Sequence, residues 1–71
     1  MLIKRSFTLS GHATSVALEP EFWQVLDRLA RSQNRALASL INEIDQDRGQ
    51  QPLASACRVF VVKRLNSTTE G

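Results

Sequence analysis

Polar and apolar residues alternate with a period near two along the first part of the chain, which predicts β-strands. In residues 12–18, Val16 and Leu18 alternate with small or polar neighbours, and residues 1–11 contain a similar alternation. The dipeptide Ser10-Gly11 separates the two stretches and suits a turn or a change of direction. We therefore predict a ribbon strand over residues 12–18, preceded by a basic arm or leading strand within residues 1–11.

The spacing of apolar residues becomes helical after Glu19-Pro20, where proline fits a first helical turn and acidic side chains favour its positive end. We predict helices over residues 20–33, 36–48 and 53–65. Trp23 falls at the edge of the apolar face of the first helix. The apolar positions are Phe22, Val25, Leu26, Leu29 and Ala30, then Leu37, Leu40, Ile41 and Ile44, then Leu53, Ala56, Cys57, Phe60, Val61 and Leu65.

Short polar segments separate the predicted helices. Asn34 can adopt the left-handed conformation that commonly ends a helix. Val59 and Val62 lie off the apolar stripe of the third helix, so this helix is expected to touch more than one neighbour. Residues 66–71 are polar and show no period, so we expect a frayed tail.

The size of the chain and its single clear strand predict a homodimer. A 71-residue chain with 42% hydrophobic residues buries only about 60% of its unfolded surface as a monomer. The strand over residues 12–18 has no evident partner in a strand-helix-helix unit, and its buried backbone groups need one. The predicted fold is mainly α with a short β-ribbon, an intertwined homodimer with intermolecular antiparallel strands.

The leading segment leaves other arrangements open. Residues 3–9 could be an ordered arm, a segment that orders only on DNA, or a strand that folds back through Ser10-Gly11 as a hairpin. In the hairpin case, with residues 3–9 paired over or beside the ribbon, we expect the surface of the ribbon to be blocked, and the ribbon would then serve for dimerisation only.

Charge and composition limit the compartment and the partners. Nine Lys and Arg against seven Asp and Glu give a net charge of +2, which permits DNA binding without demanding it. We expect no signal peptide at the start of the sequence, and no run of apolar residues is long enough for a membrane span. The single Cys57 cannot form an internal disulfide, which suits the cytoplasm.

Candidate catalytic or metal-binding chemistry is weak. His12 is the single histidine and Cys57 the single cysteine, and they lie far apart in the sequence, so one chain is not expected to form a metal site from them. Glu43, Asp45 and Asp47 are interpreted as a solvated helix end. With no nucleophile-base arrangement or phosphate loop, we predict neither an enzyme nor a cofactor.

The order of strand, Glu-Pro-Glu helix start, short turn and second amphipathic helix resembles the ribbon-helix-helix DNA-binding proteins. The resemblance covers about residues 4–65 and points to a bacterial branch with an added C-terminal helix. The stretches that carry it are Lys4-Arg5-Ser6, residues 11–23, residues 40–45 and residues 53–61.

The resemblance implies a dimeric β-ribbon in the DNA major groove, with the start of the second helix against the phosphate backbone. It assigns the base-facing positions to Ala13, Ser15 and Ala17, so Ser15 is the central hydrogen-bonding group. The DNA-backbone positions that we expect are Lys4, Arg5, His12 and Arg35, together with the amides of Ala36, Leu37 and Ala38.

The sequence therefore predicts a transcriptional repressor that binds double-stranded DNA as a homodimer or a dimer of dimers. The alternative is a dimeric protein-interaction module or an antitoxin-like protein, in which the ribbon serves for dimerisation and the third helix binds a protein partner.

Overall fold

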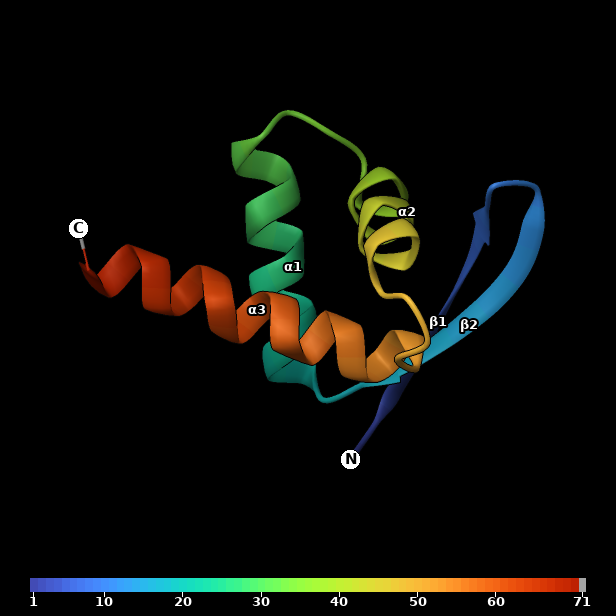
Figure 1. The fold of residues 1–71 in the computed structure, drawn as a ribbon, viewed down its shortest axis with the longest axis horizontal. Helices are drawn as coiled ribbons and strands as arrows, with labels where there is room; N and C mark the ends of the chain where they lie inside the picture. The colour runs from blue at the N-terminus through green and yellow to red at the C-terminus, as the bar shows by residue number, and fades with distance from the viewer. Residues whose placement is uncertain (71) are drawn as a thin grey trace.

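The computed structural model describes the backbone of residues 1–70 and the side chains of residues 1–67. It contains a two-stranded antiparallel sheet followed by three helices (Figure 1). This order confirms the predicted fold class of a short ribbon, two helices and a third C-terminal helix. The elements are β1 (Ile3–Leu9), β2 (His12–Leu18), α1 (Pro20–Ser32), α2 (Leu37–Asp47) and α3 (Leu53–Glu70).

The two strands form a tight hairpin within one chain, with Ile3 opposite Leu18 and Leu9 opposite His12. The turn residues Ser10 and Gly11 have φ angles of 50° and 84°. Two consecutive left-handed residues match the two-residue turn whose twist agrees with that of the flanking strands. The Ser10 hydroxyl donates to Asn42 Oδ1 of α2 at 3.1 Å, which ties the turn to the helices.

The expectation that β2 has no strand partner in its own chain is wrong, because β1 pairs with it along its full length. The left-handed turn reverses the chain and brings residues 3–9 beside β2. One edge of β2 is therefore satisfied without a second copy. Pairing of the other edge with a second chain remains a prediction.

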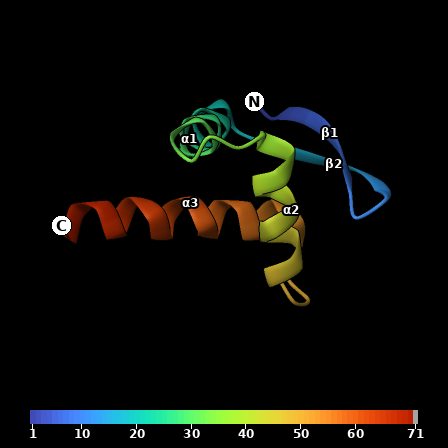
Figure 2. The same ribbon diagram turned by 90° about the horizontal axis from the view of Figure 1, so that it is seen from above.

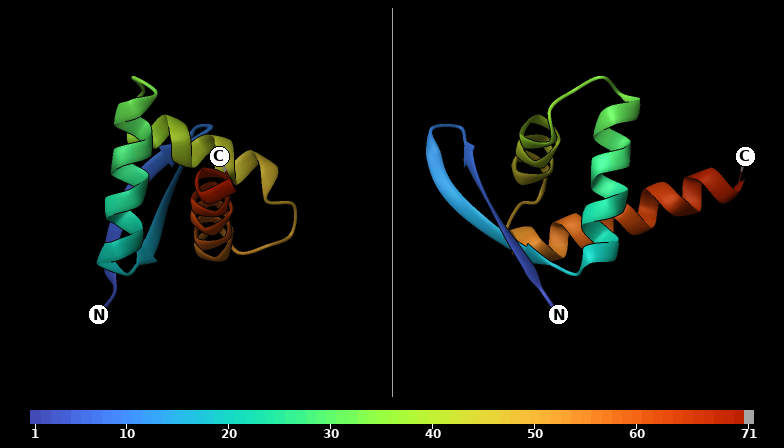
Figure 3. Two further views of the ribbon diagram at one scale, coloured as in Figure 1. Left: turned by 90° about the vertical axis from the view of Figure 1, so that its left-hand side faces the viewer. Right: turned by 180° about the vertical axis from the view of Figure 1, so that it is seen from behind.

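The inner face of the hairpin packs on the three helices and completes one hydrophobic core. Figure 3 shows the hairpin at one side of the crossing helices, and Figure 2 shows the C-terminal half of α3 extending beyond the other elements. Full burial of one Val, Leu, Ile or Phe side chain contributes roughly 1.5–3 kcal/mol to the stability of the fold. The buried residues are Leu9, Val16, Leu18, Trp23, Leu26, Ala30, Leu40, Ile41, Ile44, Ala56, Cys57 and Val61.

Trp23 holds β1 against α1. Its side chain is only 1% exposed, whereas the sequence placed it at the edge of the apolar face. The indole Nε1 donates to the backbone oxygen of Ile3 at 2.8 Å, and the Phe7 ring lies 6.0 Å from the indole ring. The difference from expectation arises because β1 covers a side of α1 that a single-strand fold would leave open.

Arg5 of β1 makes a second contact with α1, through an ion pair and a cation–π interaction. Its guanidinium lies 4.6 Å from the centre of the Trp23 ring and donates to both carboxylate oxygens of Asp27, at 3.1 and 3.3 Å. The bidentate geometry fixes the direction of the guanidinium. Both side chains are more than a third exposed, so the pair specifies where β1 lies more than it stabilises the fold.

The helix ends follow local rules. Asn34 has a φ of 55°, which agrees with the predicted left-handed turn after α1.

An ion pair joins α3 to the start of α1: Arg58 of α3 donates to Glu19 Oε1 at 3.0 and 3.1 Å. The pKa of Glu19 is lowered, first by a backbone hydrogen bond and then by Arg58.

The third helix is longer than predicted. The expected tail over residues 66–71 is wrong for residues 66–70, which continue α3 to Glu70; Gly71 lies outside the described residues. No Gly or Pro interrupts residues 53–70, so nothing stops the helix from propagating. Within residues 1–70, none of the helices is long and apolar enough to cross a membrane.

The Trp23→Ala change is expected to lower the free energy of unfolding by about 3–5 kcal/mol, because it leaves a cavity and removes the bond to Ile3. Trp23→Phe keeps most of the packing and leaves the Ile3 oxygen unpaired, for an expected cost of about 1–3 kcal/mol. Denaturant titration followed by circular dichroism measures both. The exposed neighbour Gln24 supplies the control: Gln24→Ala should change the value by less than about 0.5 kcal/mol, and a Trp23→Ala effect equally small would contradict the anchoring role.

Candidate nucleic-acid interface

The outer face of the hairpin carries six side chains that point away from the helices. Successive strand residues point to opposite faces, so the paired positions 4 and 17, 6 and 15, and 8 and 13 share one face. All but Ala17 are exposed, and Ala17 is partly exposed. The six residues of this outer face are Lys4, Ser6, Thr8, Ala13, Ser15 and Ala17.

This geometry brings together the three residues predicted to face bases, Ala13, Ser15 and Ala17. The chain does form the hairpin for which we expected a blocked ribbon. β1 lies beside β2, and Ala13 and Ser15 are exposed on the outer face, so DNA contact by these residues remains a prediction. The outer face has no acidic side chain. A surface of small residues with three hydroxyls and one lysine suits a polyanion with hydrogen-bonding edges.

Two members of the outer face were missed from the sequence, Ser6 and Thr8. The Ser6 and Ser15 hydroxyl oxygens lie 3.3 Å apart, and either can be the donor. The alternation of Ser6 and Thr8 with buried or partly buried Phe7 and Leu9 was the available signal. It could not be used without knowing that β1 pairs beside β2.

The neighbouring basic residues Lys4 and Arg5 have different surroundings. Lys4 lies on the outer face and is exposed. Arg5 faces the helix side, where Asp27 and Trp23 engage its guanidinium. A DNA-backbone contact of Arg5 stays a prediction, and a phosphate would have to compete with Asp27 for the guanidinium. His12 is exposed at the start of β2, beside the hairpin turn.

The start of α2 exposes the predicted backbone amides. Ala36 is the N-cap residue and makes no side-chain cap, and its carbonyl accepts from the amides of Ser39 and Leu40 at 3.1 and 3.3 Å. The first amides of a helix have no partner within the helix. Ala36 and Ala38 are exposed and Leu37 is partly buried, so this helix end is open to an anion.

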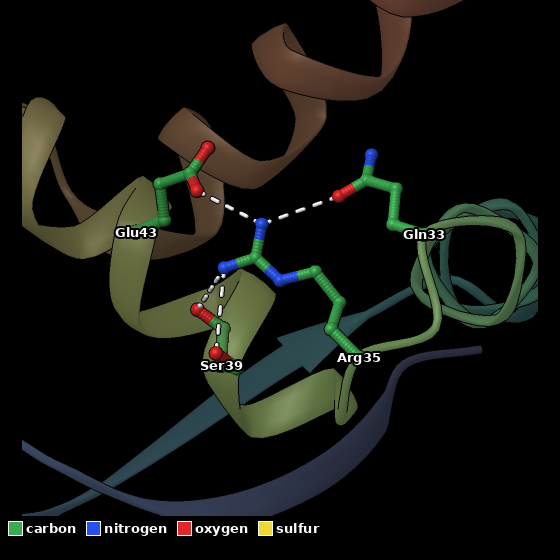
Figure 4. Close-up of polar contacts among 4 residues, drawn as sticks. All are labelled: Gln33, Arg35, Ser39 and Glu43. Carbon is green, nitrogen blue, oxygen red and sulfur yellow. Dashed lines mark hydrogen bonds and ion pairs between the residues drawn. The ribbon is translucent and has the colours of Figure 1, made fainter.

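Arg35 lies directly before this helix end but turns along α2 (Figure 4). Its guanidinium donates to Glu43 Oε1 at 2.9 Å, to the Ser39 backbone oxygen at 3.0 Å and to Gln33 Oε1 at 3.2 Å. An anion at the α2 start would have to compete with Glu43 for Arg35.

Arg31 is not among the predicted site residues, yet it lies close to the start of α2. A shallow depression of about 310 Å³ is lined by Arg31, Arg35 and Leu37, together with Asp27 and Ala30. Two arginines therefore flank the open helix end. Their proximity depends on how α1 and α2 cross, which spacing along the sequence does not show.

The acidic and sulfur-bearing residues do not assemble a reactive site in the described part of the chain. Among the side chains of residues 1–67, no three His, Cys, Asp or Glu residues form a group that could hold a metal ion. Asp45 accepts from Arg48 at 2.6 Å, and Glu43 from Arg35. Burial raises the pKa of the Cys57 thiol to about 11, which keeps it protonated and unreactive at neutral pH.

Comparison with known proteins agrees with this architecture. Residues 2–65 match the family model described as the ribbon-helix-helix domain. No curated protein and no solved structure matches the chain. Since the match covers most of the chain, including the hairpin and the first two helices, the protein belongs to the ribbon-helix-helix family, whose domains are typically DNA-binding transcription regulators or antitoxins.

Proposed function

We propose that the protein is a sequence-specific DNA-binding protein that acts as a transcriptional repressor in the bacterial cytoplasm. The observation that carries the proposal is the open outer face of the hairpin, which has three hydroxyls, one lysine and no acidic side chain. A two-stranded ribbon fits the major groove, where base edges expose donors, acceptors and thymine methyl groups. Ser15 would hydrogen-bond base edges, and Ala13 and Ala17 would contact methyl groups.

The start of α2 supports this reading by offering a place for a DNA phosphate. Its first amides are open, and Arg31 and Arg35 line the adjacent depression. Backbone amides and the helix dipole both favour an anion at such a position. Phosphate contacts of this kind position a protein on the duplex, while base contacts choose the sequence. Lys4 and His12, at the two ends of the ribbon, would add further phosphate contacts.

We further propose that the protein binds as a homodimer, or as a dimer of dimers on adjacent sites. A net charge of +2 implies few phosphate contacts per chain, so tight binding needs several chains acting together. Apolar side chains left exposed on a chain of this size also favour a second copy. Those on β1 and α3 are Ile3 at 40% exposure, Val59 at 39%, Val62 at 50% and Leu65 at 46%.

A second candidate is a protein-interaction role through α3, as in an antitoxin. The observation that favours it is the exposed apolar stripe on α3, where Val59 and Val62 line a depression with Arg58 and Lys63. An amphipathic helix of a partner could lie along such a stripe.

Selection from random-sequence DNA pools at two salt concentrations, with the solution mass measured alongside, tests the proposed function. We expect a two-fold symmetric motif bound by a dimer or tetramer, with affinity that falls as salt rises. Ser15→Arg should abolish or change the motif, and Val62→Asp on α3 should leave it unchanged. A stable protein with no enriched motif and no salt-sensitive binding would contradict DNA recognition and favour the α3 candidate.

The Glu43→Gln change is expected to raise DNA affinity about two- to fivefold, because it releases Arg35 from a surface ion pair of the usual strength. Fluorescence anisotropy with the selected DNA measures the affinity. Glu21→Gln, on the exposed first turn of α1, removes the same charge without affecting Arg35. An equal gain in affinity from both variants would mean that the gain comes from net charge alone. No gain from Glu43→Gln would show that Arg35 does not contact DNA.

A further inference from the structure

We propose that Asp27 couples the position of β1 to phosphate binding at the start of α2. Arg5 raises DNA affinity by neutralising Asp27, and it does so without touching DNA. Arg5 and Asp27 are thus positioning residues, which act through the arginines that would meet a phosphate. The coupling rests on the proposed DNA binding and concerns the phosphate contact alone.

Asp27 takes part in two arrangements at once. Its carboxylate oxygens accept from the guanidinium of Arg5 on β1 at 3.1 and 3.3 Å. The same residue lines the depression of about 310 Å³ at the start of α2, together with Arg31 and Arg35. A change at β1 can therefore reach the start of α2 through this one carboxylate.

The charges around the depression make the state of Asp27 important for an anion. Its other lining residues are the two arginines and the apolar Ala30 and Leu37, so Asp27 is the one acid in the lining. An unpaired carboxylate there would repel a phosphate. It would also draw Arg31 toward itself, because the two residues have the i, i+4 spacing at which an acid and an arginine pair on a helix.

Arg5 is well placed to prevent both effects. Its guanidinium engages both oxygens of Asp27 and lies 4.6 Å from the centre of the Trp23 ring, and the bidentate geometry fixes its direction. A phosphate that bound Arg5 directly would have to displace Asp27 and would leave its carboxylate unpaired beside the depression. This exchange favours an indirect role of Arg5 over a direct contact.

The exposure of the pair sets the size of the effect. The Arg5 and Asp27 side chains are 38% and 37% exposed, so water and salt screen the interaction. We therefore expect the coupling to change DNA affinity about two- to fivefold, the range of a surface ion pair. The effect should shrink as the salt concentration rises.

A double-mutant cycle with Arg5→Gln, Asp27→Asn and the double variant tests the coupling. Fluorescence anisotropy with the selected DNA measures affinity at two salt concentrations, below the lowest thermal midpoint so that every variant is folded. We expect Arg5→Gln to lower affinity about two- to fivefold and Asp27→Asn to raise it by a similar factor. The double variant should bind like Asp27→Asn, because Arg5 then has no carboxylate to neutralise.

Lys63→Gln and Glu21→Gln are the matched controls, since they remove the same charges from exposed positions away from the depression. Their effects on affinity should be small and additive. Rescue of Arg5→Gln by Asp27→Asn beyond this additive effect distinguishes the coupling from a loss of β1 packing, which a second substitution at the same contact would not repair.

The contradicting results separate the coupling from the proposed function. If Arg5→Gln lowers affinity by the same factor with and without Asp27→Asn, or leaves affinity unchanged in the wild-type background, the coupling is wrong and DNA binding stands. If the wild-type protein binds no DNA, the proposed function and the coupling fail together.

Discussion

The rest of the structure depends on the backbone pairing of β1 with β2. Burial of Val16 and Leu18 withdraws β2 from water, and its peptide groups then need partners. The turn at Ser10-Gly11 supplies a partner strand from the same chain. Once β1 is there, Trp23 has a surface to pack against and an acceptor for its indole N–H, so the hairpin and α1 stabilise each other.

The same pairing separates the two faces of the ribbon. Lys4 and Arg5 are adjacent in sequence and both basic, yet one points outward and the other is clamped by Asp27. The inner face builds the core, and the outer face keeps hydroxyl groups exposed. The three helices thus back one face of the hairpin while its other face keeps polar groups exposed, and the proposed contact with base edges rests on this arrangement.

Local sequence patterns were sufficient to place the helices and β2 because period, proline and left-handed turn signals act within a few residues. The partner of β2 was not predictable, since strand pairing is decided by distant contacts. Arg5 and Asp27 are 22 residues apart, and nothing local marks them as a pair. For the site, the β2 residues and the α2 start were indicated by family resemblance, while Ser6, Thr8 and Arg31 required the three-dimensional arrangement. The end of α3 was misjudged because a polar composition was interpreted as loss of helix.

The central claim is that β1 and β2 of one chain pair with each other as a hairpin. Isotope-filtered NMR on a mixture of labelled and unlabelled protein, free and bound to DNA, tests it most directly. The structure predicts a close backbone contact between Ser6 and Ser15 that is seen within one chain and is absent from the spectrum of contacts between chains. A Ser15 to Ser15 contact between chains, with the Ser6 to Ser15 contact missing, would contradict it.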